Sequence, residues 1–246
     1  MGSTRYILIF TISMCVIAAL MLSGMFYATK PAADINEVVF NKRAILAAVN
    51  THLEKNVSDM TDEEVLEVFN TRVEQVAINT QGEEVESIQA EDIDMAKERK
   101  KPMAERVLPF FVYSTKSGEK YYILSVRGSG LWDEIWGNIA LESDLNTVAG
   151  ASFDHKAETP GLGAEIKDNP SFPAQFINKN IYNEEGKLVS VTVRKGGARD
   201  PKHEVDGISG ATITGDGVSK MLENGLEMYK PYLEKVRAEK GAEVKG

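Results

Sequence analysis

The feature that most restricts this chain is an uncharged apolar run near its start. From Tyr6 to Thr29 there are 24 residues without a charge, bounded by Arg5 and Lys30. As a helix rising 1.5 Å per residue, the run would measure roughly 36 Å, enough to cross a hydrocarbon core about 30 Å thick. We therefore predict a retained transmembrane anchor at residues 1–30. A cleaved signal peptide is the alternative, but its apolar core usually has only about 7–15 residues.

The part of the chain beyond this run is acidic. All 37 acidic residues lie after Lys30, together with all but two of the 28 basic residues, which leaves a formal charge of −11. Nucleic acid and anionic lipid headgroups are therefore poor candidate partners. Basic residues lie just outside both ends of the apolar run, so the positive-inside rule does not fix its orientation.

Cysteine and histidine usage excludes several kinds of redox and metal site. Cys15, the only cysteine, lies inside the apolar run, so the rest of the chain has no thiolates for a disulfide, a zinc site or an iron–sulfur cluster. The three histidines form no His-Glu-x-x-His pattern, and we expect no metal site. Any redox chemistry therefore needs an organic cofactor.

The periodicity of apolar residues predicts an α+β domain after the anchor. Apolar spacing predicts a helix from Ile35 to Val49, a second from Thr61, where Thr61-x-x-Glu64 has capping-box spacing, and a third over 217–240. The charged stretch from Glu83 to Lys101 is expected to be a loop or an exposed helix. Strands are predicted at 73–78, 107–115, 120–127, 135–141, 148–155 and 188–194. Neighbouring strands with helices at both ends favour α+β over a doubly wound parallel sheet.

One segment combines hydroxyl groups with residues that have almost no side chain. From Asp206 to Thr214 the sequence reads Asp-Gly-Ile-Ser-Gly-Ala-Thr-Ile-Thr. Small residues let a bulky group approach the backbone, and exposed N–H groups can cradle a phosphate. The alternative is a turn that leads into a strand.

A second segment, from His155 to Glu165, reads His-Lys-Ala-Glu-Thr-Pro-Gly-Leu-Gly-Ala-Glu. Pro160 fixes one backbone angle while the two glycines free their neighbours, so the loop can lie flat against a planar ring, with Glu158 or Thr159 as polar contacts. The alternative is a helix start with Thr159 as the cap and Pro160 at the first helical position.

Two further segments place single residues of interest. Gly128-Ser-Gly-Leu-Trp puts Leu131 and Trp132 beside glycines after a strand, an arrangement that could also be core packing. Gly128-x-Gly130 continues as Leu-Trp-Asp, so the dinucleotide fingerprint is missing and we infer no NADH site. Lys195, after the last predicted strand, could place a cation near a phosphate or a ring, or could lie in a solvated turn.

These segments resemble the signatures of the FMN-binding domain family. Asp206–Thr212 is similar to its flavinylation motif, Glu158–Gly163 to its Glu-Thr-Pro-Gly-Leu-Gly signature and Gly130–Trp132 to its Gly-Leu-Trp segment. The resemblance implies covalent FMN, attached by a phosphoester to Thr212 by a dedicated flavin transferase. We expect the remaining flavin-binding residues to be Asp206, Ser209, Gly210, Ala211, Glu158, Thr159, Gly161, Leu162, Gly163, Leu131, Trp132 and Lys195. Lys195 is included for its charge alone.

The order of the segments along the chain resembles the C subunits of bacterial sodium-translocating NADH:quinone oxidoreductases. The resemblance implies that NADH is oxidised on another subunit and that this FMN relays electrons towards a further flavin subunit and quinone; no catalytic residue is assigned here. It also implies that the chain is a single-pass protein of the bacterial inner membrane, with its domain on the periplasmic side. The expected partners are the other subunits, the flavin transferase and the lipid bilayer.

We expect three segments: the anchor (1–30), an α+β N-terminal part (31–127) and the FMN-binding domain with its C-terminal helix (128–246). Two alternatives stay open. The flavin-carrying G subunits of Rnf ferredoxin:NAD oxidoreductase complexes share the anchor and motifs, although the roughly 100 residues before Gly128 fit the sodium-translocating family better. A pilin-like membrane-anchored protein shares the general plan, but the apolar run lacks the internal glutamate of pilins.

Overall fold

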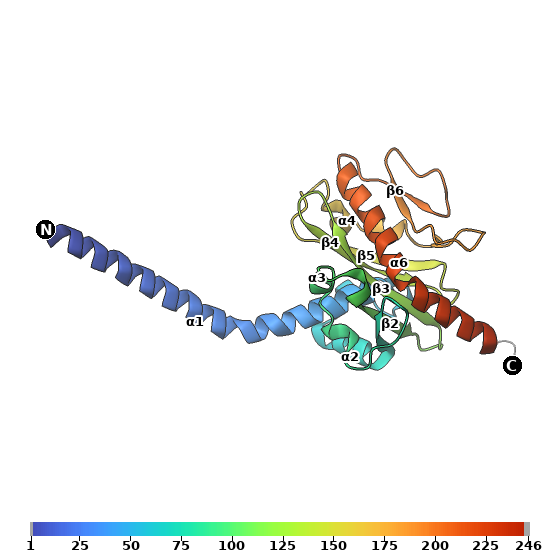
Figure 1. Cartoon of the computed structure of the whole chain (residues 1–246), viewed down its shortest axis with the longest axis horizontal. Coiled ribbons are helices and arrows are strands. Elements are labelled where there is room, and N and C mark those ends of the chain that lie inside the picture. The colour runs from blue at the N-terminus through green and yellow to red at the C-terminus, as the bar shows by residue number, and fades with distance from the viewer. Residues whose placement is uncertain (1, 244–246) are drawn as a thin grey trace. The chain divides into compact units, whose positions relative to one another are not determined.

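The computed structural model describes residues 2–243, which divide into two compact units, one up to Asn41 and the other from Lys42 onward. The first unit is the greater part of helix α1 (Gly2–Ala47), drawn in blue in Figure 1. The side chains of its apolar run are exposed, and α1 is the one helix among the described residues that is long and apolar enough to cross a membrane. The predicted helix after Pro31 is the C-terminal part of α1.

The second unit is built on an antiparallel five-stranded sheet whose strands follow chain order. The predicted strands of residues 73–155 are confirmed within two residues at each end. The strands are β1 (Val73–Asn79), β2 (Val107–Ser114), β3 (Lys120–Ser129), β4 (Glu134–Leu141) and β5 (Val148–His155). All neighbouring strands pair antiparallel, and the class is α+β as predicted.

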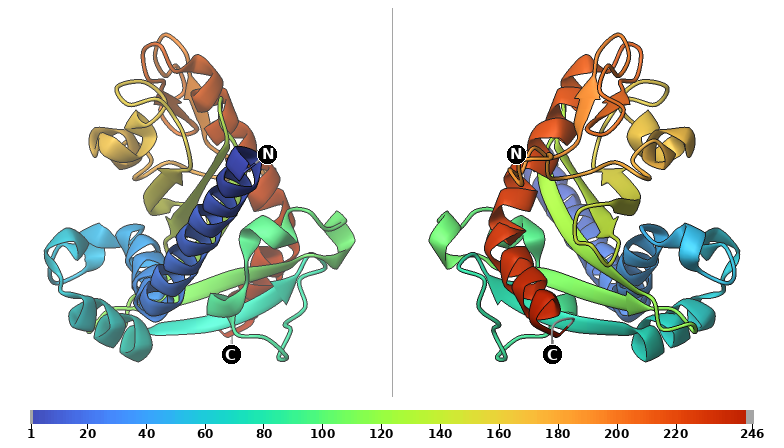
Figure 2. Two further views of the ribbon diagram at one scale, coloured as in Figure 1. Left: turned by 90° about the vertical axis from the view of Figure 1, so that its left-hand side faces the viewer. Right: turned by 90° about the vertical axis from the view of Figure 1, so that its right-hand side faces the viewer.

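Helix α6 (Thr212–Glu243) lies against the sheet over β3, as the right-hand view of Figure 2 shows. Its approach is close because glycines lie at the contact: a Cβ on Gly128 would come 2.7 Å from Met221 Cβ, and one on Gly225 would come 3.0 Å from Val126 Cβ. The predicted apolar stripe of the helix is confirmed as core. The buried stripe residues are Val218, Met221, Leu222, Leu226, Tyr229 and Leu233.

Short helices and the end of α1 pack against the sheet. Helix α2 (Asp62–Arg72) begins with the predicted capping box of Thr61 and Glu64. The end of α1 is bound to the sheet, because the Ala44 carbonyl accepts hydrogen bonds from Asn138 Nδ2 (3.1 Å) and Ser152 Oγ (2.8 Å). The other short helices are η1 (Asn50–His52), η2 (Val57–Asp59), η3 (Ala90–Asp92), α3 (Met95–Glu98), η4 (Met103–Glu105), α4 (Glu165–Asp168) and α5 (Ser171–Ala174).

Some boundaries differ from those predicted. The strand expected at 188–194 is reduced to β6 (Thr192–Arg194), which pairs in parallel with β7 (Glu204–Asp206), a strand that was not predicted. Helix α6 begins at Thr212 and not at Gly217. The proposed boundary at 127/128 falls inside β3, and the residues on both sides of it belong to one compact unit.

Candidate functional site

The segments singled out in the sequence come together at one end of the sheet. The turn between β3 and β4 carries Leu131 and Trp132, the loop after β5 carries Glu158, and the first turn of α6 carries Thr212 and Thr214. Glu158 joins all three, because its Oε1 accepts from the Trp132 backbone N–H (3.0 Å) and its Oε2 from Thr214 Oγ1 (2.6 Å). The chain separation of these partners, 26 and 56 residues, makes this a tertiary arrangement.

The loop after β5 is a tight turn and not a helix start. The Thr159 carbonyl accepts from the N–H groups of Leu162 and Ala164, both at 3.1 Å, and Gly161 has a positive φ of 73°. The Thr159 hydroxyl accepts from Trp132 Nε1 (3.1 Å). The alternative that Thr159 caps a helix is therefore wrong: α4 begins only at Glu165, after Ala164.

The hydroxyl-rich segment connects β7 directly to α6. Gly210 has a positive φ of 77°, and a Cβ there would come 2.7 Å from Leu162 Cδ2, so the turn lies close against the neighbouring loop. Because Gly215 N donates to the Ala211 carbonyl (2.9 Å), α6 starts at Thr212, and the alternative of a turn leading into a strand is wrong. The backbone N–H groups of the first helical turn have no partner within the helix, which makes such a terminus a site for anions.

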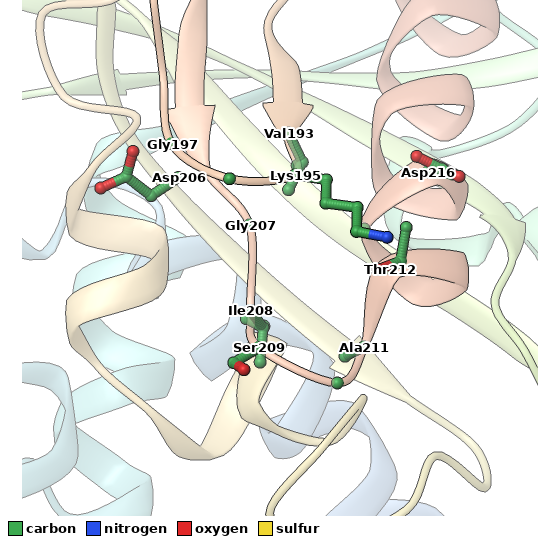
Figure 3. A pocket seen from close by; sticks show the side chains of 13 residues that line it. Val193, Lys195, Gly197, Asp206, Gly207, Ile208, Ser209, Ala211, Thr212 and Asp216 are labelled. Carbon is green, nitrogen blue, oxygen red and sulfur yellow. The ribbon is translucent and has the colours of Figure 1, made fainter.

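A cleft of about 460 Å³ lies in front of this helix terminus. Figure 3 shows the Lys195 side chain extending towards Thr212, whereas the Asp206 side chain points away from it. Asp206 Oδ1 instead accepts from the Ala198 N–H (2.7 Å), so Asp206 holds the turn that carries Lys195. The lining includes Lys195, Asp206, Ser209, Ala211, Thr212 and Asp216.

The two threonines of the segment have opposite environments. Thr212 is half-buried and lines the cleft, whereas Thr214 is 1% exposed and its hydroxyl donates to Glu158. Ser209 is exposed at the turn. Of the three hydroxyls, Thr212 is thus the one that combines access to the cleft with a place in the first turn of α6.

Four large apolar side chains lie exposed beside the site. They are Leu131, Trp132, Leu162 and Ile213, with exposed fractions of 46, 68, 41 and 57%. Their exposure leaves these side chains free to contact a planar ligand or a partner. Ile213 was not predicted as a site residue. A predicted helix that began at Thr212 and not at 217 would have placed Ile213 beside Thr212.

Glu158 and Thr159 were expected to contact a ring directly, but their polar groups bind the protein. Glu158 is 4% exposed, with both carboxylate oxygens occupied, and the Thr159 hydroxyl holds the Trp132 indole. The Glu158 N–H donates to His155 Nδ1 (3.2 Å). No group of three or more His, Cys, Asp or Glu side chains suited to a metal occurs within residues 2–243.

The comparisons with known proteins agree with this geometry. The family model for the FMN-binding domain matches residues 130–227. The C subunit of the Na(+)-translocating NADH-quinone reductase from Pseudomonas aeruginosa is 32% identical, over 96% of this chain and 98% of the relative. The chain belongs to this C-subunit family.

Solved structures of the C-subunit family share the fold. A crystal structure of the family member from Parabacteroides distasonis has a TM-score of 0.73 at 37% identity, covering 83% of this chain and 96% of that one. That of NqrC from Shewanella oneidensis has a TM-score of 0.69 at 27% identity, covering 84% and 99%. The resemblance seen in the sequence is confirmed.

Proposed function

We propose that this chain is the FMN-carrying electron-transfer subunit of a sodium-translocating NADH:quinone reductase, with FMN held by a phosphoester on Thr212. Membership of the C-subunit family and the match to the FMN-binding domain support the subunit and its cofactor. The attachment at Thr212 rests on one observation: of the two threonine hydroxyls in the first turn of α6, only that of Thr212 lies at the cleft.

The surroundings of Thr212 suit a phosphodiester. Such a group keeps one negative charge, which the N-terminus of a helix stabilises by about 0.3–1 kcal/mol at a surface. Lys195 extends towards the same hydroxyl and adds a second positive group. The cleft volume, about 460 Å³, lies within the range of small-molecule sites.

Formation of the phosphoester needs an activated phosphate, so the donor is a flavin nucleotide with a pyrophosphate bond. The Thr212 oxygen forms the new bond to phosphorus, the bond from phosphorus to the leaving phosphate breaks, and the hydroxyl proton is released. A flavin transferase is the partner for this step.

When bound, FMN supplies one-electron transfer chemistry, and the chain's own residues hold and surround it. We assign Leu131, Trp132 and Leu162 to the ring, because they are exposed apolar side chains on the two loops that meet the start of α6 through Glu158 and at Gly210. Ser209, Gly210 and Ala211 shape the turn beside the phosphate, and Gly161 and Gly163 shape the facing loop. Electrons come from, and leave to, other subunits of the complex.

The experiment is an in-gel ultraviolet fluorescence scan of denatured full-length protein coexpressed with a flavin transferase. Wild type should fluoresce, Thr212→Ala should be dark, and Ser209→Ala, which removes a neighbouring hydroxyl, should stay fluorescent. A dark wild-type band would overturn covalent attachment, and a bright Thr212→Ala band would overturn the assignment to this residue.

We also propose that α1 anchors the chain in the inner membrane with the sheet domain on the periplasmic side. The turn between β2 and β3 gives a test, because Ser117 is exposed there and Cys15 lies in the apolar run. In a Cys15→Ser background, Ser117→Cys should react with a membrane-impermeant thiol reagent in cells with a permeabilised outer membrane. Labelling only after lysis would show that the sheet domain lies on the cytoplasmic side and would overturn this proposal.

A further inference from the structure

The Glu158 carboxylate is a buried acceptor at the centre of the site. It is 4% exposed, and its two hydrogen bonds, from Trp132 N (3.0 Å) and Thr214 Oγ1 (2.6 Å), come from different elements. An ionised carboxylate can only accept, and both partners can donate, so the three groups match. The Glu158 N–H is fixed in turn by His155 Nδ1 (3.2 Å), which leaves the residue little freedom.

Two glycines of the sequence segments make room for this carboxylate. A Cβ on Gly130 would collide with Glu158 Oε1, and one on Gly163 would collide with Oε2 and come 2.6 Å from Thr214 Oγ1. The φ of neither residue lies in the left-handed region, so their conformation alone does not require glycine. The space for Glu158 does require it.

The two hydrogen bonds to Glu158 depend on each other. Bonds to a charged acceptor are stronger than neutral ones, and bonds that share one buried group reinforce one another. If Thr214 lost its hydroxyl, Oε2 would be left without its partner in a buried place, and the carboxylate would move towards water. The Trp132 turn would then lose its attachment to α6.

We propose that Glu158 is a positioning residue of the flavin site, which holds the turn of Leu131 and Trp132 at a fixed place relative to the helix terminus that carries Thr212. This inference rests on the proposed function, because it assumes a ring attached at Thr212. Glu158 itself does not touch the ring. It determines where the two side chains that flank the ring lie.

The first test is amide hydrogen exchange at Trp132 in the full-length protein, comparing Thr214→Val with Thr214→Ser. Valine keeps the shape and removes the donor, whereas serine keeps the donor. Loss of a bond to a charged group should increase the population of the open turn about tenfold, so protection of the Trp132 amide should fall about tenfold in Thr214→Val. Protection should be retained in Thr214→Ser and, in all variants, at Ile123 and Leu124 of β3, which are fully buried.

The second test concerns the flavin. In protein coexpressed with the flavin transferase, the visible circular dichroism per covalent flavin should decrease in Thr214→Val and in Glu158→Gln, because a mobile ring loses the signal of a fixed one. It should persist in Thr214→Ser. A merely stabilising residue would lower the melting temperature without changing this signal.

Equal amide protection in Thr214→Val and Thr214→Ser would overturn the inference. So would a loss of protection without any change in the flavin signal, because Glu158 would then hold the turn without positioning the ring. If wild-type protein carried no covalent flavin, the proposed function would fail instead, and the amide result would still decide whether Glu158 holds the turn.

Discussion

The space around Glu158 allows a quantitative prediction for two glycines of one loop. A methyl group at Gly163 would collide with Glu158 Oε2 and come 2.6 Å from Thr214 Oγ1 and 3.2 Å from Glu158 Cβ. The side chains it meets are buried and bound to each other, so the hydrogen bond between them must break or the loop must move. Gly161, two residues earlier, is the matched control: nothing lies within 4 Å of its Cβ position, but its φ is +73°.

The two substitutions therefore carry different costs. At Gly161 an alanine costs about 1–2 kcal/mol for the left-handed backbone. At Gly163 overpacking costs about 1–3 kcal/mol and loss of a bond to a charged group about 1.5–3 kcal/mol. Both variants gain about 0.4–1 kcal/mol from a stiffer unfolded chain. We expect Gly161→Ala to lower the free energy of unfolding by about 0–1.6 kcal/mol, and Gly163→Ala by about 1.5–5.6 kcal/mol.

Urea unfolding followed by tryptophan fluorescence measures this difference in the full-length protein. Trp132 and Trp136 are the only tryptophans and both lie near the site, so the signal reports on the sheet domain and not on the anchor. If Gly161→Ala proves more destabilising than Gly163→Ala, backbone strain outweighs the packing around Glu158, and our account of these glycines is refuted.

Three further predictions concern charge and packing. Lys195→Gln should slow flavinylation of Thr212 by about two- to fivefold at low salt, and the difference should shrink at high salt, as initial rates of flavin incorporation can show. The hydrogen bond from Arg194 is the main cause that lowers the pKa of Glu204 from 4.5 to about 2. The ionised carboxylate therefore stabilises the fold above pH 4.5, and this stabilisation is lost as the pH falls towards 2. In Arg194→Gln, an NMR titration should find the pKa of Glu204 raised towards 4.5, so the stabilisation should be lost at a higher pH than in wild type. Gly225→Ala gains about 1 kcal/mol of helix propensity but overpacks against Val126 by about 1–3 kcal/mol, so denaturation should show net destabilisation that Val126→Ala relieves.

Much of the fold follows from local sequence patterns. Alternation of apolar and polar residues identified the first strand, and β-rich runs on either side of turn residues identified the next two. The spacing of Thr61 and Glu64 identified the start of α2. The apolar stripe of α6 was equally clear. The helix α6 was predictable because it buries one face, which leaves a helical period in the sequence. Strands β2 to β5 are buried on both faces and were detectable as continuous runs of strand-forming residues.

The start of α6 was harder to predict because its first turns contain Gly215 and Gly217, which are poor helix formers. The structure supplies a reason for Gly217: a Cβ there would collide with the Ser129 carbonyl, so glycine permits α6 to approach β3. Strand β7 has only three residues and no period to detect. In both places tertiary contact outweighs local preference.

The role of Glu158 could not be read from its own loop, because the residues that define it lie 26 and 56 positions away. Its local surroundings suggested an exposed polar group facing a ring, and the burial that contradicts this comes from two other chain segments. Glycine at positions 130 and 163 indicates a close neighbour at each, but only the structure shows that the Glu158 carboxylate is the neighbour of both Gly130 and Gly163.

The start of α6 also explains why two threonines so close together have different tasks. Successive residues of an α-helix are about 100° apart, so residues 212 and 214 point in directions about 200° apart. If one hydroxyl faces the cleft, the other must face the interior, where an unpaired hydroxyl is costly unless an acceptor such as Glu158 meets it. Under the proposed function, the geometry that exposes Thr212 to a flavin donor withholds Thr214 from it, so loss of the Thr212 hydroxyl should leave no second hydroxyl acceptor on that face of the first turn.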